Sequence, residues 1–247
     1  MRTSALAVTM TMLLALQMPA DPSSARGTAP AAVGGQVNVA LEATLGADGS
    51  VRGAMTATWS GACAADLRAR LKAMTAQQRA TALALLAEPP LAGHVKPAVD
   101  EKDLAGTADL VVRYAVDAPR YAAPPAGAGG SRRALSLRLP LLRPYDPMKV
   151  PPAVLPLSVN QDVVLKLPPD MAPLELPSAF STVTPEAGRY VLWFDTDRSD
   201  GPRLKIRREM AIDGTAPERL KELMEGMSPR DGTAISIVPV TPRRTSG

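Results

Sequence analysis

The high proline content limits the fold of this chain more than any other feature. Twenty-five of the 247 residues are proline and 18 are glycine, and proline can neither continue a helix nor donate a hydrogen bond inside a sheet. The pattern favours short strands separated by turns over a helical bundle. Hydrophobic residues make up 46% and aromatic residues 3%. The chain can therefore build one large or two small domains around Leu, Val, Ala and Met.

The first structured stretch is predicted to be a β-hairpin. Residues 37–41 alternate between apolar and polar side chains, and Asp48-Gly49 tolerates the positive φ angles of a tight turn. Residues 51–59 then return as a second strand, rich in small and β-branched side chains.

After the hairpin, the apolar residues recur at helical spacing, which predicts a pair of helices. Residues 62–74 carry apolar side chains at helical spacing, and a second run over 75–87 begins with Thr75, a good N-cap residue. Pro89-Pro90 follow, where a helix cannot continue.

Beyond the helix pair, strands dominate. They are expected at residues 95–99, 109–116, 134–142, 162–168, 189–197, 203–212 and 234–240. A short helix over 216–226 is predicted by Pro217 in its first turn and Gly226 near its end. The fold class is therefore mainly β, antiparallel and β-sandwich-like, with a helix pair near 62–87 and a short C-terminal helix.

The N-terminal segment is typical of a secretory signal. Arg2 precedes an apolar run over 5–16 that is too short to span a bilayer, and cleavage is expected after Ala20 or Ala25. The predicted location is periplasmic or extracellular, with an uncleaved anchor as the alternative. The predicted segments are a signal peptide (1–25), a flexible lead-in (26–35), a hairpin, helix pair and strands (36–122), a flexible loop (123–132), an antiparallel β-sandwich portion with a short helix (133–240) and a tail (241–247).

Charge and motif content argue against nucleic acid and cofactors. The net charge is +4, but basic and acidic residues are interleaved, and pairs such as Arg132-Arg133 have no stacking aromatic residues beside them. The chain has one cysteine and one histidine, too few for a zinc site without several carboxylates. Phosphate-loop and dinucleotide patterns are absent. We expect no nucleic-acid partner and no cofactor, and membrane contact only through an uncleaved N-terminal segment.

From residue 36 onward, the order of motifs is similar to that of a known family. A hairpin is followed by G-x-C-A-A-D-L-R, a helix pair and V-D-E-K-D-L-A-G-T-A-D-L-V-V-R-Y. Later come L-S-L-R-L-P-L-L, D-V-V-L-K-L-P-P-D-M-A-P-L-E-L-P and R-L-K-I-R-R-E. Over residues 36–227 the chain resembles the β-rich C-terminal region of bacterial exported transglutaminase-like proteins. The resemblance implies a β-sandwich-type, non-catalytic module.

The chain also departs from that family. There, this region follows an N-terminal β domain and a transglutaminase-fold core whose Cys, His and Asp have no counterpart here. The expected function is that of an exported, non-catalytic binding, accessory or structural module of the cell envelope, with another envelope protein or a polymer as partner. The alternative is the truncated product of a longer transglutaminase-like gene.

The sole cysteine is the main candidate for catalysis. Cys63 lies at the start of a predicted helix, where the helix dipole and free N–H groups favour a thiolate. His94 and Asp100 follow in the order of a Cys-His-Asp enzyme, so the three residues form an alternative transglutaminase- or protease-like site. Against this site, Asp66 one turn into the helix raises the pKa of a nearby thiol. We therefore favour a buried structural cysteine.

An acidic loop is the second candidate site. In D-T-D-R-S-D-G, residues 195–201, Asp195, Asp197 and Asp200 could supply oxygen ligands for calcium. The spacing departs from that of an EF-hand, and no Glu closes the loop. A hairpin turn between two strands explains the same residues, and we favour it over a metal site.

Overall fold

The structure is a computed structural model that describes residues 34–87, 91, 93–124, 134–139, 141–231 and 234–240. The chain divides into two units, Met1–Ala31 and Ala32–Gly247, and every described residue belongs to the second. The predicted signal peptide and tail, and most of the predicted lead-in and loop, lie outside the described residues. Their assignments stay predictions.

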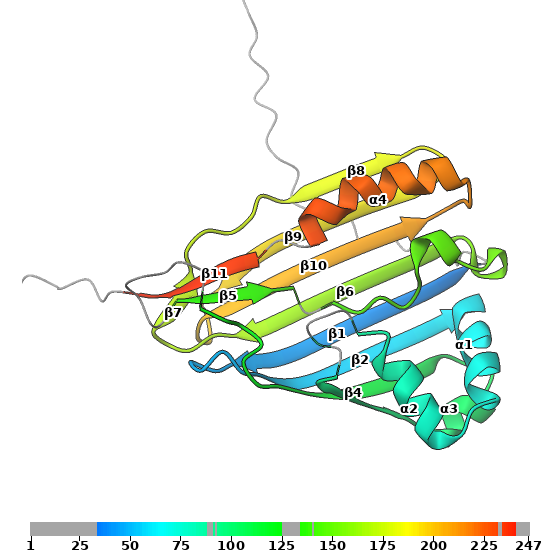
Figure 1. Cartoon of the computed structure of the whole chain (residues 1–247), viewed down its shortest axis with the longest axis horizontal. Helices are drawn as coiled ribbons and strands as arrows, with labels where there is room; N and C mark the ends of the chain where they lie inside the picture. The colour runs from blue at the N-terminus through cyan, green and yellow to red at the C-terminus, as the bar shows by residue number, and fades with distance from the viewer. Residues whose placement is uncertain are drawn as a thin grey trace, which may run out of the picture. The chain divides into compact units, whose positions relative to one another are not determined.

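The described strands form one sheet of eight and a second of three, so the mainly β class is confirmed (Figure 1). The large sheet has the order β3-β4-β2-β1-β6-β10-β9-β8. Its strands are β1 Gly35–Leu45, β2 Val51–Gly61, β3 Val95–Val99, β4 Leu110–Ala118, β6 Leu157–Lys166, β8 Phe180–Thr184, β9 Gly188–Asp197 and β10 Arg203–Ile212. The small sheet has the order β5-β11-β7, with β5 Leu135–Arg138, β7 Met171–Pro173 and β11 Ala234–Pro239.

The helix pair and the C-terminal helix are also confirmed. The helices are α1 Ala62–Lys72, α2 Ala76–Ala84, α3 Glu101–Ala105 and α4 Pro217–Asp231, with 3-10 turns at Pro147–Lys149 and Pro152–Val154. Thr75 caps α2 as predicted: its hydroxyl accepts from the Gln78 N–H at 3.3 Å, and the Gln78 side chain accepts from the Thr75 N–H at 2.8 Å. This reciprocal capping box satisfies two N–H groups that would otherwise lack partners.

The predicted hairpin is formed by β1 and β2. Their antiparallel register runs from Gly35 opposite Gly61 to Leu45 opposite Val51. Gly49 has a φ of 80° in the turn, a conformation that glycine adopts without strain.

One strand pair differs from the antiparallel expectation. β1 pairs with β6 in parallel, with Gly35 opposite Leu157 and Thr44 opposite Lys166. Because β1 and β6 lie far apart in the sequence, the long connection lets β6 run in the same direction as β1. The predicted portions 36–122 and 133–240 therefore share one continuous sheet.

Side-chain alternation gives the large sheet one buried and one open face. The five outward residues of β1 are exposed and the six inward ones are buried. Helices α1 to α4 and the small sheet lie on the same side of the large sheet (Figure 1). The core lies between them and includes the fully buried Trp59, Tyr114 and Tyr190. The opposite face, called the open face below, carries polar residues on its central strands.

Several element boundaries differ from the prediction. β5 ends at Arg138 rather than near 142, shortly before Pro140, which cannot donate to a ladder. The sequence did not predict α3, β7 or β8. Gly226 does not end the last helix, because α4 continues to Asp231. The nearest atoms to a Cβ added at Gly226 belong to Thr182 of β8, at 3.4 Å.

Candidate functional site

The predicted catalytic residues lie at opposite ends of the large sheet. The backbone of His94 accepts from the Asp117 N–H at 3.0 Å, and Asp117 pairs with Arg52 of β2. Gly61 ends that strand nine residues from Arg52, and Cys63 lies just beyond it in α1. At a rise of about 3.3 Å per residue, Cys63 and His94 are about 30 Å apart. A proton transfer between them is excluded in this structure, since it needs about 3 Å.

Asp100 also fails to meet His94. The two residues flank the five-residue strand β3, which separates them by about 20 Å. Asp100 instead caps α3, because its Oδ1 accepts from the Lys102 N–H at 2.9 Å. The structure therefore does not bring Cys63, His94 and Asp100 together, and the carboxylate assigned to a triad has a helix-capping role.

Cys63 lies in the hydrophobic core at the start of α1. Its side chain is fully buried, and burial raises the pKa of its thiol to about 11, with Asp66 adding to the rise and Tyr145 opposing it. A Cβ at Gly35 would clash with the Cys63 sulfur. The thiol thus packs closely against the start of β1, in its neutral form.

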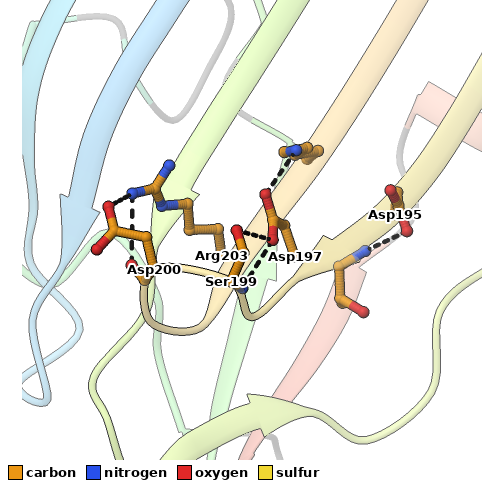
Figure 2. A network of polar contacts seen from close by, with 7 residues as sticks. Asp195, Asp197, Ser199, Asp200 and Arg203 are labelled. Atoms are coloured by element: carbon orange, nitrogen blue, oxygen red, sulfur yellow. Dashed lines mark hydrogen bonds and ion pairs between the residues drawn. The ribbon is translucent and has the colours of Figure 1, made fainter.

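The acidic loop forms the hairpin turn between β9 and β10 (Figure 2). Asp197 Oδ1 accepts from the N–H of Ser199 at 2.9 Å and from its hydroxyl at 2.7 Å, while Oδ2 accepts from Lys205 at 2.8 Å. Asp200 is ion-paired with Arg203. Asp195 accepts from the N–H of Thr196 and lies apart from the other two carboxylates in Figure 2.

These contacts use the carboxylates for the turn itself. The Lys205 and Ser199 hydrogen bonds hold the pKa of Asp197 well below its usual range. The loop therefore carries its own cations beside two of the three carboxylates proposed as calcium ligands. Among the described residues, no three His, Cys, Asp or Glu side chains are grouped closely enough to hold a metal ion.

The open face carries a different constellation, which we call the amide–hydroxyl patch. It consists of two rows of three residues across β6, β1 and β2. These residues are Ser158, Gln36 and Ser60 in one row, and Asn160, Asn38 and Thr58 in the other. All six are exposed or half-buried, and none is charged.

Side-chain amides connect the patch across the parallel strand pair. Asn38 Oδ1 accepts from Asn160 Nδ2 at 3.0 Å and from Gln36 Nε2 at 3.1 Å. Asn38 Nδ2, Asn160 Oδ1 and Gln36 Oε1 make no hydrogen bond to the described residues. The patch therefore presents oriented donors and acceptors to solvent.

A tryptophan lies on the same face, two strands from β6. Trp193 of β9 is half-buried and faces outward, opposite Arg207 of β10. Arg207 Nε in turn binds Asp162 of β6 at 2.9 Å. Strand spacings of about 4.8 Å place Trp193 about 12 Å from Asn160. The open face thus combines hydrogen-bonding groups with one aromatic ring.

The positions of these groups are now fixed by register and by contacts. No family model, curated protein or solved structure matches the chain. Among the described residues, no helix is both long enough and apolar enough to cross a membrane.

Sequence reasoning missed the amide–hydroxyl patch, although a signal was present. The chain contains two asparagines, Asn38 and Asn160. Asn38 lies in a predicted strand, and Asn160 lies two residues before the strand predicted at 162–168, within the observed strand β6. Asparagine is depleted in strands, so an asparagine within an alternating pattern points to a role on the exposed face. Their contact depends on the parallel register, which the local pattern does not encode.

Proposed function

We propose that this chain is an exported, non-catalytic binding protein of the cell envelope, and that its amide–hydroxyl patch binds a neutral, hydroxyl-rich polymer such as a polysaccharide. The observation that carries this proposal is the set of outward amide atoms on Asn38, Asn160 and Gln36 that lack partners among the described residues. Each hydroxyl of a sugar can both donate and accept, so it matches a surface that offers both kinds of group.

The shape of the surface supports an extended ligand. The patch spans three neighbouring strands, and Trp193 lies further along the same face. The indole ring offers a flat apolar surface to the C–H face of a sugar ring. Amides at a fixed distance from that ring then fix the register of the bound polysaccharide. Several consecutive sugar rings can contact both groups at once.

The composition of the patch favours a polymer over a protein partner. The cores of protein interfaces are enriched in aromatic residues, methionine and arginine. The six patch residues are amides and hydroxyls, groups that prefer a hydrated, polar ligand. A second envelope protein, the other expected partner, would therefore have to dock elsewhere.

Two further lines support the non-catalytic part of the proposal. The distance of about 30 Å between Cys63 and His94 supports a structural role for the cysteine, because a thiol enzyme needs the two groups within about 3 Å of each other. The mainly β fold agrees with the resemblance to the C-terminal region of transglutaminase-like proteins, which stays a prediction. Export rests on the sequence of residues 1–25, which lie outside the described residues.

Affinity electrophoresis tests the proposal directly. The protein is run through native gels containing dextran, a soluble β-glucan or a galactomannan, and it is also co-sedimented with peptidoglycan sacculi. We expect at least one polymer to bind, and Asn160→Ala to weaken that binding about five-fold, the effect of one lost hydrogen bond of about 1 kcal/mol. Trp193→Ala should weaken the same interaction.

The matched control is a glutamine pair. Gln36→Ala removes an amide of the patch, whereas Gln77→Ala removes an exposed amide of α2. We expect the first to weaken binding and the second to leave it unchanged. If no polymer binds, or if both glutamine variants behave alike, the patch is not the binding site.

A further inference from the structure

The described strands leave four edges, and an edge strand presents backbone N–H and C=O groups that can pair with another chain. The edges are β3 and β8 in the large sheet and β5 and β7 in the small sheet. Proteins protect such edges with proline, charged side chains, very short strands or a covering segment. The four edges differ in whether they carry these protections.

Three of the four edges are protected. β3 contains Lys96 and Pro97, and proline cannot donate a hydrogen bond to a partner strand. β7 has only three residues and ends in a proline. On the side of β5 away from β11, Ala123 and Ser136 form a bridge with hydrogen bonds of 3.2 and 2.7 Å. None of these three edges offers a continuous row of free backbone groups.

β8 lacks all of these protections. Its five residues include neither a charged residue nor a proline, and four of them are β-branched or aromatic, the best strand formers. Among the described residues, the backbone groups of Ser181, Thr182 and Val183 pair only with β9. Helix α4 packs against β8 and β9, and it lies along the inner side of β8 in Figure 1. The outer side of β8 is therefore open to a further strand.

A side chain on this edge is also exposed in a way that a further strand would relieve. Val183 is 71% exposed and lies on the open face, opposite Arg189 of β9. A strand added beside β8 would cover part of the valine, because neighbouring strands lie about 4.8 Å apart.

We propose that two copies of this chain pair through β8, antiparallel about Thr182, and so join their large sheets into one. Thr182 then lies opposite Thr182 of the partner subunit, and Val183 lies opposite Ser181 of the partner subunit. Both kinds of pair are uncharged, and paired threonines stabilise neighbouring strands. The edge is therefore complementary to itself.

The other edges make a second copy the fitting occupant and limit the assembly to two. Pairing β8 with β3 of a second copy would leave further edges open and continue as a filament, but Pro97 and Lys96 oppose it. Pairing β8 with β8 uses the unprotected edge of each copy and closes. Five residues a side is few beside the 20 to 30 or so of a standard interface, so the dimer is weak. This inference is independent of the function proposed for the open face.

A charge swap at positions 181 and 183 tests the pairing. Ser181→Lys with Val183→Lys places like charges opposite each other twice across the dimer axis, whereas Ser181→Lys with Val183→Glu places opposite charges there. Sedimentation equilibrium of the whole protein over a wide concentration range measures the dissociation constant of the dimer. We expect like charges to raise it about ten-fold or more, and opposite charges to leave it within about three-fold of wild type.

The matched control is Ala98→Lys, which gives β3 exposed lysines at positions 96 and 98, on the edge that the dimer does not use. It should leave the dissociation constant unchanged, with all variants folded by circular dichroism. The proposal is overturned if the wild-type protein is monomeric at every concentration. It is equally overturned if the like-charge variant dimerises as wild type does, if the opposite-charge variant is as weak as the like-charge one, or if Ala98→Lys weakens the dimer as much.

Discussion

Cys63 shows how burial, rather than position in the sequence, decides the chemistry of a residue. A helix start favours a thiolate, but the sulfur is packed against Gly35 and shielded from water, and the cost of burying a charge is larger than the helix effect. The direction of the Asp66 effect, which raises the thiol pKa, agrees with the expectation from the sequence. The thiol therefore serves as a small apolar side chain.

This pKa predicts how stability depends on alkaline pH. The thiol has its ordinary pKa of 9.0 when unfolded and a pKa of about 11 when folded, so the wild-type protein loses stability as pH rises from about 9 to 11. Cys63→Ala lacks this loss. We expect the variant to be less stable by about 1 kcal/mol at pH 7, with the gap narrowing above pH 9. Urea unfolding at each pH measures it, and a constant gap would contradict the assigned burial of the thiol.

Asp197 gives the opposite pH dependence. Its hydrogen bonds to Lys205 and Ser199 hold its pKa below the usual value, so its contribution is present above pH 4 and is lost as pH falls through the folded pKa. Asp197→Asn should be less stable than wild type at pH 6, with the difference shrinking towards pH 2. Asp195→Asn is the control, since Asp195 makes no ion pair among the described residues. Equal pH dependence in the two variants would show that the turn contacts do not matter.

At the scale of elements, Gly226 of α4 is a residue whose position in the helix the sequence pattern alone predicted wrongly. Leu220, Leu223 and Met227 are buried, and the helix packs against β8 and β9 as a cover for the core. Gly226 lies inside the helix rather than at its end, and the nearest atoms to an added Cβ belong to Thr182 at 3.4 Å. Rules based on the local sequence place a glycine at the end of a helix. They contain no information on strand β8, which packs against α4 at Gly226.

A stabilising substitution follows from that geometry. Gly226→Ala should raise the free energy of unfolding by roughly 0.5 to 1 kcal/mol, since alanine is the better helix former and the 3.4 Å contact needs only a small adjustment of Thr182. Thermal unfolding of the variant, alone and combined with Thr182→Ser, measures the effect. A destabilised single variant that the second change rescues would mean that the contact with Thr182 is too tight.

Elements with a strong local signal could be predicted from the sequence, and those set by distant contacts could not. The first hairpin, the Thr75 cap and β10 carry alternation, turn residues or capping side chains within a few positions. α3 is only five residues long. The sequence signal for its start is the N-cap residue Asp100 before an acidic first turn, and the sequence pattern suggests Asp100 as a catalytic residue instead. β8 follows a proline-containing stretch and is stabilised by β9 and α4. The site was missed for the same reason, because Asn38 and Asn160 are 122 positions apart.

At the scale of the whole described unit, the parallel pair of β1 and β6 joins the two portions of the chain into one sheet. β2 and β4 lie on one side of this pair and β10 and β9 on the other. The hydrophobic core continues across the junction, from Trp59 to Tyr190. The two portions should therefore unfold together rather than as separate domains.

The two tryptophans make this cooperativity measurable. Trp59 is buried on β2, and Trp193 is half-buried on β9, so each reports on a different portion. Trp193→Phe leaves only Trp59 as a reporter, and Trp59→Phe leaves only Trp193. In each variant we expect fluorescence and circular dichroism to give the same urea midpoint. A tryptophan signal that changes well before the circular dichroism would show that the portions unfold independently.

The central claim is that the amide–hydroxyl patch binds a neutral polymer, and the two asparagines provide its most direct test. Protein labelled with ¹⁵N at asparagine alone gives two side-chain amide signal pairs, those of Asn38 and Asn160. On titration with soluble fragments of the polymer that binds in electrophoresis, both pairs should shift and saturate together, and Trp193→Ala should require more ligand. If the polymer binds while both asparagine pairs stay unmoved, the patch does not contact it and the account is wrong.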